Sequence, residues 1–224
     1  MSDNPYCPSI CRVHTFIDAQ NFFLTAKECF GYNYPNFDPI KLSQLVTGFE
    51  NERILNSIHF YTGVHSIQEN EFLHKFWMNK LQGLRRAGVD VHYRTLRYTE
   101  IRRANASGEI EIIKKPREKG IDVKIAVDLI RLSRRGLFDT VVVFSQDTDL
   151  NEAITELYEI RREFNRWIRF ESAFPFKRGM TNPRGLEGTK WRPISKEMYD
   201  QCLDKRDYRP STHPEEPTLF EEDA

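Results

Sequence analysis

An unbroken run of apolar, mostly β-branched residues, Thr140–Phe144 (TVVVF), is the sequence feature that most constrains the fold. Runs of this kind are typical of strands that are covered on both faces, as in a parallel sheet. Apolar residues at helical spacing occur before the run, over residues 121–135, and after it, over residues 150–164. A buried strand between two helices predicts an α/β protein whose sheet carries helices on both faces.

The same alternation of strands and helices extends along most of the chain. Further strands are predicted at residues 12–17, 54–62, 89–95 and 167–171, and further helices after Asp38, at 68–86 and at 195–203. Residues 102–119 and 172–192 look like irregular loops, although residues 105–108 could form the turn of a small hairpin. We therefore expect a three-layer, Rossmann-like α/β fold with a central, mainly parallel sheet of about five strands.

Domain organisation follows from composition. We expect an N-terminal extension at residues 1–11, one folded domain at 12–203, and an acidic, disordered tail at 204–224, since Lys and Arg are absent from residue 210 onward. No apolar run approaches the about 20 residues that span a bilayer, and the first residues lack the features of a signal peptide. Four scattered cysteines do not suggest a disulfide framework. We therefore expect a cytoplasmic protein that does not enter a membrane.

Charge is unevenly distributed along the chain. The formal net charge is zero, from 33 Lys and Arg against 33 Asp and Glu. Residues 84–136 nevertheless hold 14 basic and 7 acidic groups, residues 137–160 hold 6 acidic and no basic groups, and residues 161–192 hold 9 basic and 3 acidic groups. Two basic segments thus bracket an acidic one, so the zero net charge does not exclude a polyanionic partner.

Acidic residues follow two of the predicted strands. Asp18 comes directly after the first strand, whereas Asp147 and Asp149 come after Thr140–Phe144. Asp122 lies in the first turn of a predicted helix. Ligands of open α/β sheets bind beyond the carboxyl ends of the strands. Carboxylates about 4 Å apart repel by roughly 4 kcal/mol at an effective dielectric constant of about 20, so their assembly requires a cation or raised pKa values. Oxygen ligands alone suit Mg²⁺ or Mn²⁺.

Each of these acidic residues also has a structural interpretation. Asp18 could be an ordinary N-cap, Asp122 could complement a helix dipole, and Asp149 with Glu152 matches a capping box. Taken singly, the structural interpretations are favoured. Taken together, four acidic residues at one edge of a sheet favour a metal site.

Three motifs resemble those of NYN-domain proteins, which belong to the PIN-like ribonuclease superfamily. Residues 16–21 (FIDAQN) resemble I-D-G-x-N, residues 118–124 (EKGIDVK) resemble E-K-G-V-D-V, and residues 142–150 (VVFSQDTDL) resemble S-G-D-S-D-F. The motifs occur in the family's order, and the resemblance extends over roughly residues 12–171. Ala19 and Gln146 stand where the family usually has Gly, but the acidic residues are all present.

The resemblance implies metal-dependent hydrolysis of RNA phosphodiester bonds, with 5′-phosphate and 3′-hydroxyl products. Matched by motif, the catalytic residues that would hold Mg²⁺ or Mn²⁺ are Asp18, Asp122, Asp147 and Asp149. Residues implied to bind the substrate or orient these carboxylates are Asn21, Lys119, Ser145 and Thr148. The basic segments at 102–108 and 174–178 could bind single-stranded RNA through phosphate contacts and base stacking.

Two other functions fit the same sequence. One is an inactive module on the same fold that binds RNA or a protein partner, and the other is a metal-dependent nucleotide phosphatase. No Gly-rich phosphate loop occurs, so no organic cofactor is expected. The six histidines show no metal-binding spacing, and Cys7 with Cys11 lacks a second pair. Assembly into a homo-oligomer stays open.

Overall fold

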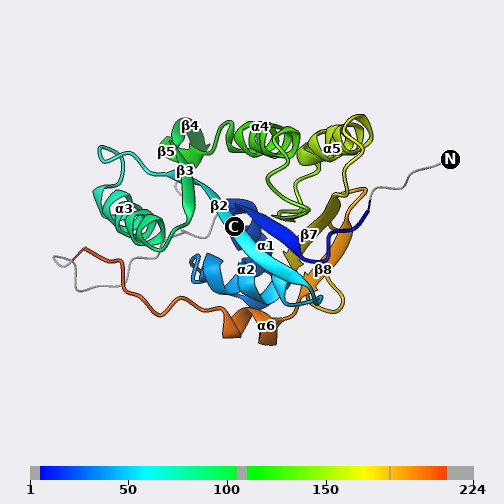
Figure 1. The fold of residues 1–224 in the computed structure, drawn as a ribbon. Coiled ribbons are helices and arrows are strands. Elements are labelled where there is room, and N and C mark those ends of the chain that lie inside the picture. Colours follow the sequence, from blue (N-terminus) through cyan, green and yellow to red (C-terminus); the bar gives the residue numbers. More distant parts are fainter. Residues whose placement is uncertain (1–5, 105–109, 182, 211–224) are drawn as a thin grey trace.

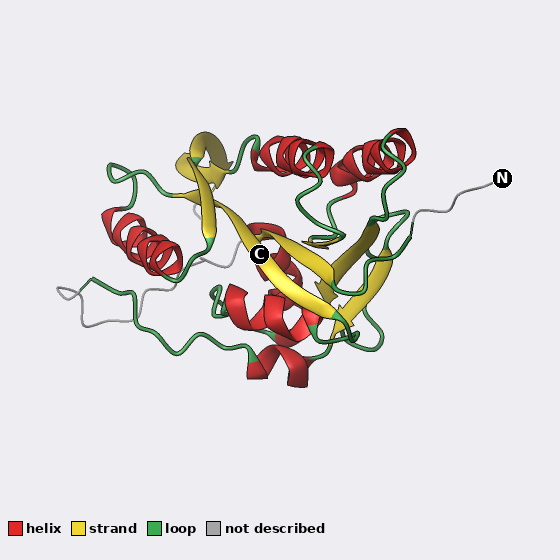
Figure 2. Ribbon diagram, in the orientation of Figure 1, coloured by secondary structure: helices red, strands yellow, loops and turns green. Residues whose placement is uncertain are grey.

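The central feature of the fold is a six-stranded parallel sheet (Figures 1 and 2). The computed structural model describes residues 6–104, 110–181 and 183–210, without the side chains of residues 103 and 104. Every adjacent pair of strands in the sheet is parallel, as expected from the sequence. In spatial order the strands are β3 (Asp90–Thr95), β2 (Arg53–Val64), β1 (Cys11–Asp18), β6 (Thr140–Phe144), β7 (Arg169–Pro175) and β8 (Lys190–Ile194).

Helices cover both faces of the sheet and give the three layers that were predicted. One apolar core lies between the sheet and α1 (Ala19–Phe30), α2 (Pro39–Thr47), α3 (Glu71–Arg86) and α6 (Lys196–Gln201). A second core lies between the opposite face and α4 (Ile121–Arg134) and α5 (Asn151–Glu163), which run above the sheet in Figure 1. All five residues of β6 are buried, as the run of apolar residues predicts.

The order of the strands reverses between β1 and β6. From β1 the first half of the chain adds β2 and β3 on one side, and the second half adds β6, β7 and β8 on the other. The carboxyl ends of β1 and β6 therefore meet at a topological switch point, where open α/β sheets bind their ligands.

A hairpin precedes α4. Strands β4 (Arg97–Ala104) and β5 (Ile110–Arg117) pair with each other in antiparallel register and form a separate two-stranded sheet. The prediction of a loop-like insert at residues 102–119 is therefore wrong for most of its length, because both strands extend beyond the predicted turn. A hairpin itself was anticipated, and its predicted turn at residues 105–108 lies outside the described residues.

The segment at residues 172–192 was predicted as an irregular loop, and this is wrong at both of its ends. Strand β7 continues to Pro175, and β8 begins at Lys190 and adds a sixth strand at the edge of the sheet. Pro193 lies within β8, and proline is tolerated in edge strands because it need not donate to a second neighbour.

The predicted tail has a packed beginning. Tyr208 is buried and belongs to the core beneath α3, and its hydroxyl donates to Asp204 Oδ2 at 2.9 Å. Residues 211–224 lie outside the described residues, so their predicted disorder stays a prediction. None of the described helices combines the length and apolar character needed to cross a bilayer.

Paired charges occupy the amino-terminal side of the sheet. Glu171 on β7 is fully buried, and it accepts hydrogen bonds from Arg53 on β2 at 2.6 Å and from Arg192 on β8 at 2.7 Å. Glu50 accepts from the same two arginines, from Lys190 at 2.6 Å, and from Arg169. Burial alone would raise the pKa of Glu171, but hydrogen bonds from the two arginines lower it.

Candidate active site

Asp18 is the last residue of β1 and lies at the switch point. Its Oδ1 accepts a hydrogen bond from the backbone N–H of Asn21 at 3.1 Å, so Asp18 is also the N-cap of α1. Ser145, which follows β6, donates from Oγ to Asp18 Oδ2 at 3.4 Å. The structural and functional interpretations of Asp18 are therefore compatible: one carboxylate oxygen caps the helix, and the other faces Ser145.

The loop after β6 brings a second carboxylate to the same place. Ser145 Oγ accepts from the backbone N–H of Asp147 at 3.1 Å, and Asn21 Oδ1 accepts from that of Gln146 at 2.9 Å. Asp147 in turn caps the short 3₁₀ helix η1 (Thr148–Leu150), where its Oδ1 accepts from the N–H of Asp149 at 3.0 Å. These bonds fix the loop against the start of α1.

The start of α4 supplies the opposite wall of the site. Gly120 is the N-cap of α4 with a φ of 79°, a conformation that favours glycine, and Asp122 lies in the first helical turn. Glu118, just before this turn, is largely buried, and its Oε2 makes no hydrogen bond. Gly63 at the end of β2 approaches it so closely that a Cβ there would lie 2.7 Å from Glu118 Oε2.

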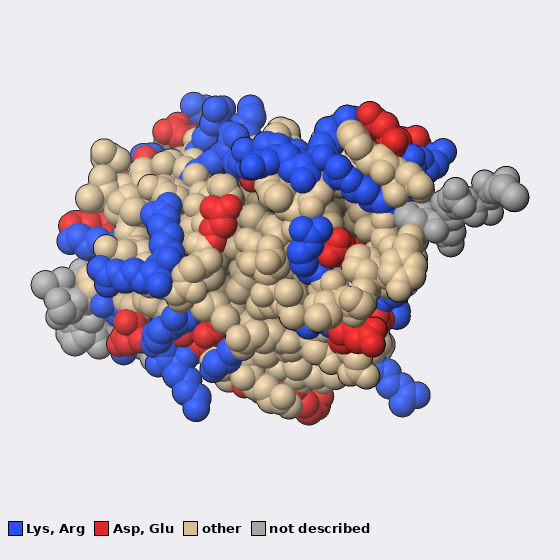
Figure 3. Space-filling model, in the orientation of Figure 1, with Lys and Arg blue, Asp and Glu red and all other residues tan. Residues whose placement is uncertain are grey.

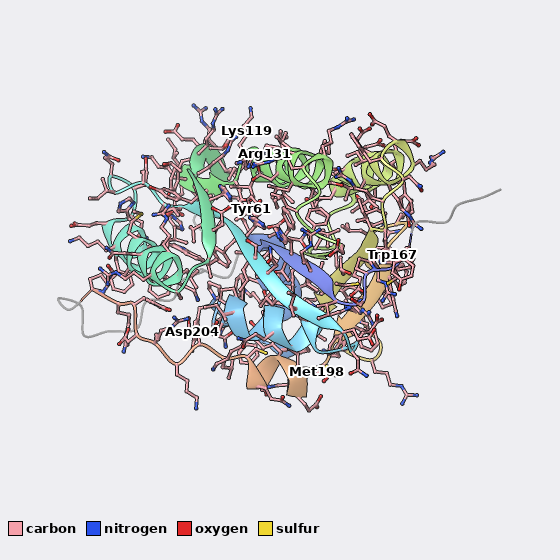
Figure 4. The ribbon with its side chains drawn as sticks, in the orientation of Figure 1. Tyr61, Lys119, Arg131, Trp167, Met198 and Asp204 are labelled. Carbon is pink, nitrogen blue, oxygen red and sulfur yellow. The ribbon has the colours of Figure 1, made fainter. Side chains whose placement is uncertain are left out.

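These elements enclose a cleft of about 520 Å³. Its lining combines three aspartates and Glu118 with basic residues; it consists of Asp18, Gln20, Asn21, Leu24, Pro116, Arg117, Glu118, Lys119, Gly120, Ile121, Asp122 and Asp147. In Figure 4, Lys119 appears where the β4–β5 hairpin meets α4. The cleft therefore presents acidic groups at its base and cationic side chains at its edge.

Two acidic groups of the cleft, Asp18 and Glu118, have raised pKa values, mainly because they are buried. Burial raises the pKa of Asp18 to about 6; hydrogen bonds from Asn21 and Ser145 counteract this, and the charges of Asp147 and Asp122 add to it. Burial likewise raises the pKa of Glu118 to about 7; the charges of Asp18 and Asp122 add to this, and a hydrogen bond from the backbone N–H of Gly63 to the carboxylate counteracts it. A bound cation would relieve this repulsion and favour the ionised forms.

The predicted site residues divide into three groups. Those that line the cleft are Asp18, Asn21, Lys119, Asp122 and Asp147. Ser145 is buried beneath them and bonds to Asp18, as expected for a residue that orients a carboxylate. Thr148 and Asp149 are exposed and are not part of the lining. The capping-box interpretation of Asp149 is wrong, because the N-cap of α5 is Leu150 and no side chain caps that helix.

The donor set of the cleft suits a hard divalent cation. All four acidic groups offer oxygen, which Mg²⁺ and Mn²⁺ prefer, and Glu118 Oε2 is a buried acceptor without a partner. Within the described part of the chain, no three of these carboxylates bring ligand atoms within 4.8 Å of one another. This spacing is compatible with Mg²⁺, which usually keeps several waters and binds through one or two carboxylates.

Two features of the structure were missed from the sequence. Glu118 belongs to the motif EKGIDVK, but no role was predicted for it. Its position directly before the start of a helix could have indicated that it lies at the site. The spacing of the histidines in the sequence indicates no metal site, but the fold brings two of them together with an aspartate. The ligand atoms of His59, Asp90 and His92 lie within 4.8 Å of one another. Residues 90 and 92 share a face of β3, and His59 on the neighbouring strand β2 pairs with Asp90.

A parallel sheet with an acidic cleft at its switch point defines a Rossmann-like α/β protein with the arrangement of a metal-dependent hydrolase. The family model of the NYN domain matches residues 12–172 of the chain. The chain therefore belongs to the NYN-domain family, a nuclease-like family whose members generally depend on divalent metals. No curated protein and no solved structure shows a significant match to the chain.

Proposed function

We propose that the protein is a ribonuclease that hydrolyses RNA phosphodiester bonds with Mg²⁺ or Mn²⁺. The observation that carries this proposal is the cleft, in which Asp18, Asp147 and Asp122 come from β1, the loop after β6 and the start of α4. These residues lie far apart in the sequence, and helix capping alone explains neither the unbonded Glu118 Oε2 nor the raised pKa of Asp18. Membership of the NYN family supports a nuclease activity.

Asp18, Asp122 and Asp147 would hold the ion, with Glu118 completing the set from the side of α4. When bound, such an ion lowers the pKa of a coordinated water and stabilises charge on the phosphate. Ser145 keeps Asp18 oriented through its hydrogen bond. Lys119 and Arg117 line the cleft and can contact the phosphates on either side of the scissile bond. Asp149, exposed beside the cleft, is proposed to contribute less.

The charge of the surrounding surface favours a polymeric substrate. Figure 3 shows Lys and Arg side chains gathered along the upper part of the molecule, above the hairpin and helices α4 and α5. The hairpin adds exposed apolar side chains next to basic ones, including Ile101, Ile110 and Ile112. Phosphate contacts combined with apolar surface suit single-stranded RNA better than a mononucleotide.

The proposal is tested with end-labelled single-stranded and structured RNAs in Mn²⁺, Mg²⁺ or EDTA. We expect cleavage that requires the metal and yields 5′-phosphate and 3′-hydroxyl ends. Asp147→Asn should remove the activity, and Asp200→Asn, at an exposed position of α6, serves as the matched control. Cleavage that persists in EDTA or in Asp147→Asn would contradict the proposal.

The same assay separates the two other functions. RNA binding without cleavage under every metal condition would favour an inactive binding module. Turnover of mononucleotides without cleavage of RNA would favour a phosphatase. A cytoplasmic location stays a sequence-based prediction, which cell fractionation tests directly.

A further inference from the structure

A second group of potential metal ligands lies on the sheet face beneath α4. His59 on β2 pairs in register with Asp90, the first residue of β3, and His92 follows two residues later on the same face. His59 Nδ1 lies 3.0 Å from Asp90 Oδ2, and His92 Nε2 lies 3.2 Å from the same oxygen. Gly63, which adjoins Glu118 of the cleft, lies four positions after His59 on β2, which is roughly 13 Å along a strand.

We propose that His59, Asp90 and His92 form a binding site for a divalent transition-metal ion, with Zn²⁺ as the first candidate, separate from the acidic cleft. Imidazole nitrogens with a carboxylate suit Zn²⁺ and its neighbours, whereas Mg²⁺ prefers oxygen alone. Tetrahedral ligands about 2.0 Å from Zn²⁺ lie roughly 3.3 Å from one another. The two distances to Asp90 Oδ2 are close to this value.

The ring nitrogen of His92 faces two carboxylates, and the structural interpretation of this contact is a histidine–aspartate ion pair. Its Nε2 is buried but makes no hydrogen bond, although two carboxylates lie within 4 Å. The ring itself is held in place, because it stacks on Tyr61 with the ring centroids 4.9 Å apart. A bound metal ion would replace the ion-pair contact with Asp90 by a direct bond to this nitrogen.

His14 and Asn56 continue the cluster and hold the second ring nitrogen of His59. His59 Nε2 lies 3.1 Å from His14 Nδ1, and His14 Nε2 lies 2.9 Å from the side-chain amide of Asn56. Ligating histidines almost always use their second nitrogen in such a hydrogen bond, which fixes the tautomer and the ring orientation. In the structure the amide nitrogen of Asn56 donates to His14 Nε2, so His14 Nδ1 donates to His59 Nε2 and the proton of His59 lies on Nδ1, facing Asp90 Oδ2 at 3.0 Å. A metal bound at His59 Nδ1 would displace this proton and reverse the chain, with the Asn56 amide turned so that its oxygen accepts from His14.

Asp128 on α4 is nearby but is already engaged. Its carboxylate accepts from Tyr61 at 2.9 Å and from Lys124 at 2.6 Å, and Arg131 lies 3.0 Å away. Figure 4 shows Tyr61 beneath α4, the helix that carries Arg131. Asp90 is therefore the carboxylate ligand. About half of its side chain is exposed, which leaves a fourth coordination position open to solvent.

The test is a Co²⁺ titration of the untagged, chelator-treated full chain, followed by visible absorption and by competition with Zn²⁺. We expect one saturable site with the bands of four- or five-coordinate Co²⁺, displaced by Zn²⁺. Asp147→Asn should leave these bands unchanged, which separates this site from the acidic cleft. Absence of the bands would overturn the proposal.

Variants of the ligands decide whether the bands report this site. His92→Gln and the surface variant Asp90→Asn should each weaken Co²⁺ binding at least about 100-fold, and Asn56→Ala about 10-fold through loss of ligand orientation. His74→Gln is the matched control, because His74 lies on α3 and bonds to the backbone carbonyl of His65. Unchanged binding in both ligand variants, with folding verified by circular dichroism, would equally overturn the proposal.

Discussion

Buried carboxylates at the two ends of the central sheet have different partners, and their pKa values shift in opposite directions. On the amino-terminal side, Glu171 is enclosed by Arg53 and Arg192, and its pKa is lowered despite complete burial. At the carboxyl end, among the described residues, Asp18 accepts hydrogen bonds from the Asn21 N–H and the Ser145 hydroxyl, and burial raises its pKa to about 6. The charge of Glu171 is balanced by the protein's own arginines, whereas balancing the charge of an ionised Asp18 requires a bound cation.

The same difference distinguishes a second pair of acidic residues, one with a structural role and one in the proposed metal site. Glu50, on the amino-terminal side, has its pKa lowered to about 2: burial opposes this change, but hydrogen bonds from Lys190 and Arg192 outweigh it. Glu118, in the cleft, has its pKa raised to about 7. Acidic groups that a fold holds together without compensating cations are typical of functional sites.

The largest effect is expected on catalysis. Asp18→Asn and Asp147→Asn should each lower Mn²⁺-dependent RNA cleavage by about 1,000-fold, because losing an ion-binding group removes several kcal/mol of transition-state stabilisation. Single-turnover cleavage rates measure the effect. Rates within tenfold of the wild type for both variants would show that the two ends do not differ in function.

On the amino-terminal side the expected loss is in stability instead. Glu171→Gln removes the fully buried counter-charge of Arg53 and Arg192 and leaves them only the partly exposed Glu50, so the free energy of unfolding should fall by at most about 3–5 kcal/mol. Urea unfolding measures it, with the exposed Glu163→Gln as control. Asp18→Asn should not destabilise the metal-free protein in this way. Equal losses of unfolding free energy in Glu171→Gln and Asp18→Asn would show that the two carboxylates contribute to stability in the same way.

The two ends should also respond oppositely to pH. In EDTA, folded Asp18 keeps its proton to about pH 6, but the unfolded chain loses it near 3.8. Its stabilising effect is therefore present below pH 3.8 and is lost as the pH rises through 6, by about 2–3 kcal/mol. Asp18→Asn should abolish this loss in urea unfolding at pH 4 and pH 7. The contribution of Glu50, in contrast, is present above pH 4.5 and is lost as the pH falls towards 2.

A smaller effect is expected from the close approach of Gly63 to Glu118. In Gly63→Ala the new methyl group would lie 2.7 Å from Glu118 Oε2 and 2.3 Å from Leu96 Cδ2, so both side chains must move. We expect Mn²⁺ affinity to fall about tenfold, as for other displaced residues around metals. Isothermal titration calorimetry measures this. Gly48→Ala, where φ is −73° and the nearest atoms would lie 3.5 Å from the new Cβ, controls for the added methyl group.

The smallest effect is expected at Asp149, which is exposed and outside the cleft lining. Asp149→Asn should lower cleavage by less than about tenfold, well below the effect of Asp147→Asn, since only a distant charge is lost. The same single-turnover assay compares the two. An equal loss in both variants would show that Asp149 enters the cleft when the metal binds.

Local patterns in the sequence were sufficient to predict most of the fold. The buried run of β6 and the helical spacing of α4 and α5 predicted their elements to within a few residues, because burial on one or both faces requires a fixed periodicity. The edge strand β8 carries no such pattern, since it is short, charged and interrupted by Pro193. The hairpin strands are mostly exposed, so their sequence resembles a basic loop.

The site was partly predictable for a similar reason. Asp18 and Asp147 directly follow buried strands, so the rule for carboxyl ends locates them. Glu118 acquires its role from Gly63, which approaches it from β2. The cluster of His59, Asp90 and His92 depends on the register of β2 with β3. Such contacts between distant segments are set by tertiary packing, which the local pattern of a single sequence does not contain.

The central claim is that the acidic groups at the carboxyl end of the sheet form a metal site. The most direct measurement is Mn²⁺ binding followed by electron paramagnetic resonance at pH 7.5, in the wild type, Asp18→Asn and His92→Gln. We predict saturable binding that survives His92→Gln and is lost in Asp18→Asn. Mn²⁺ binding that is unchanged in Asp18→Asn would contradict the claim.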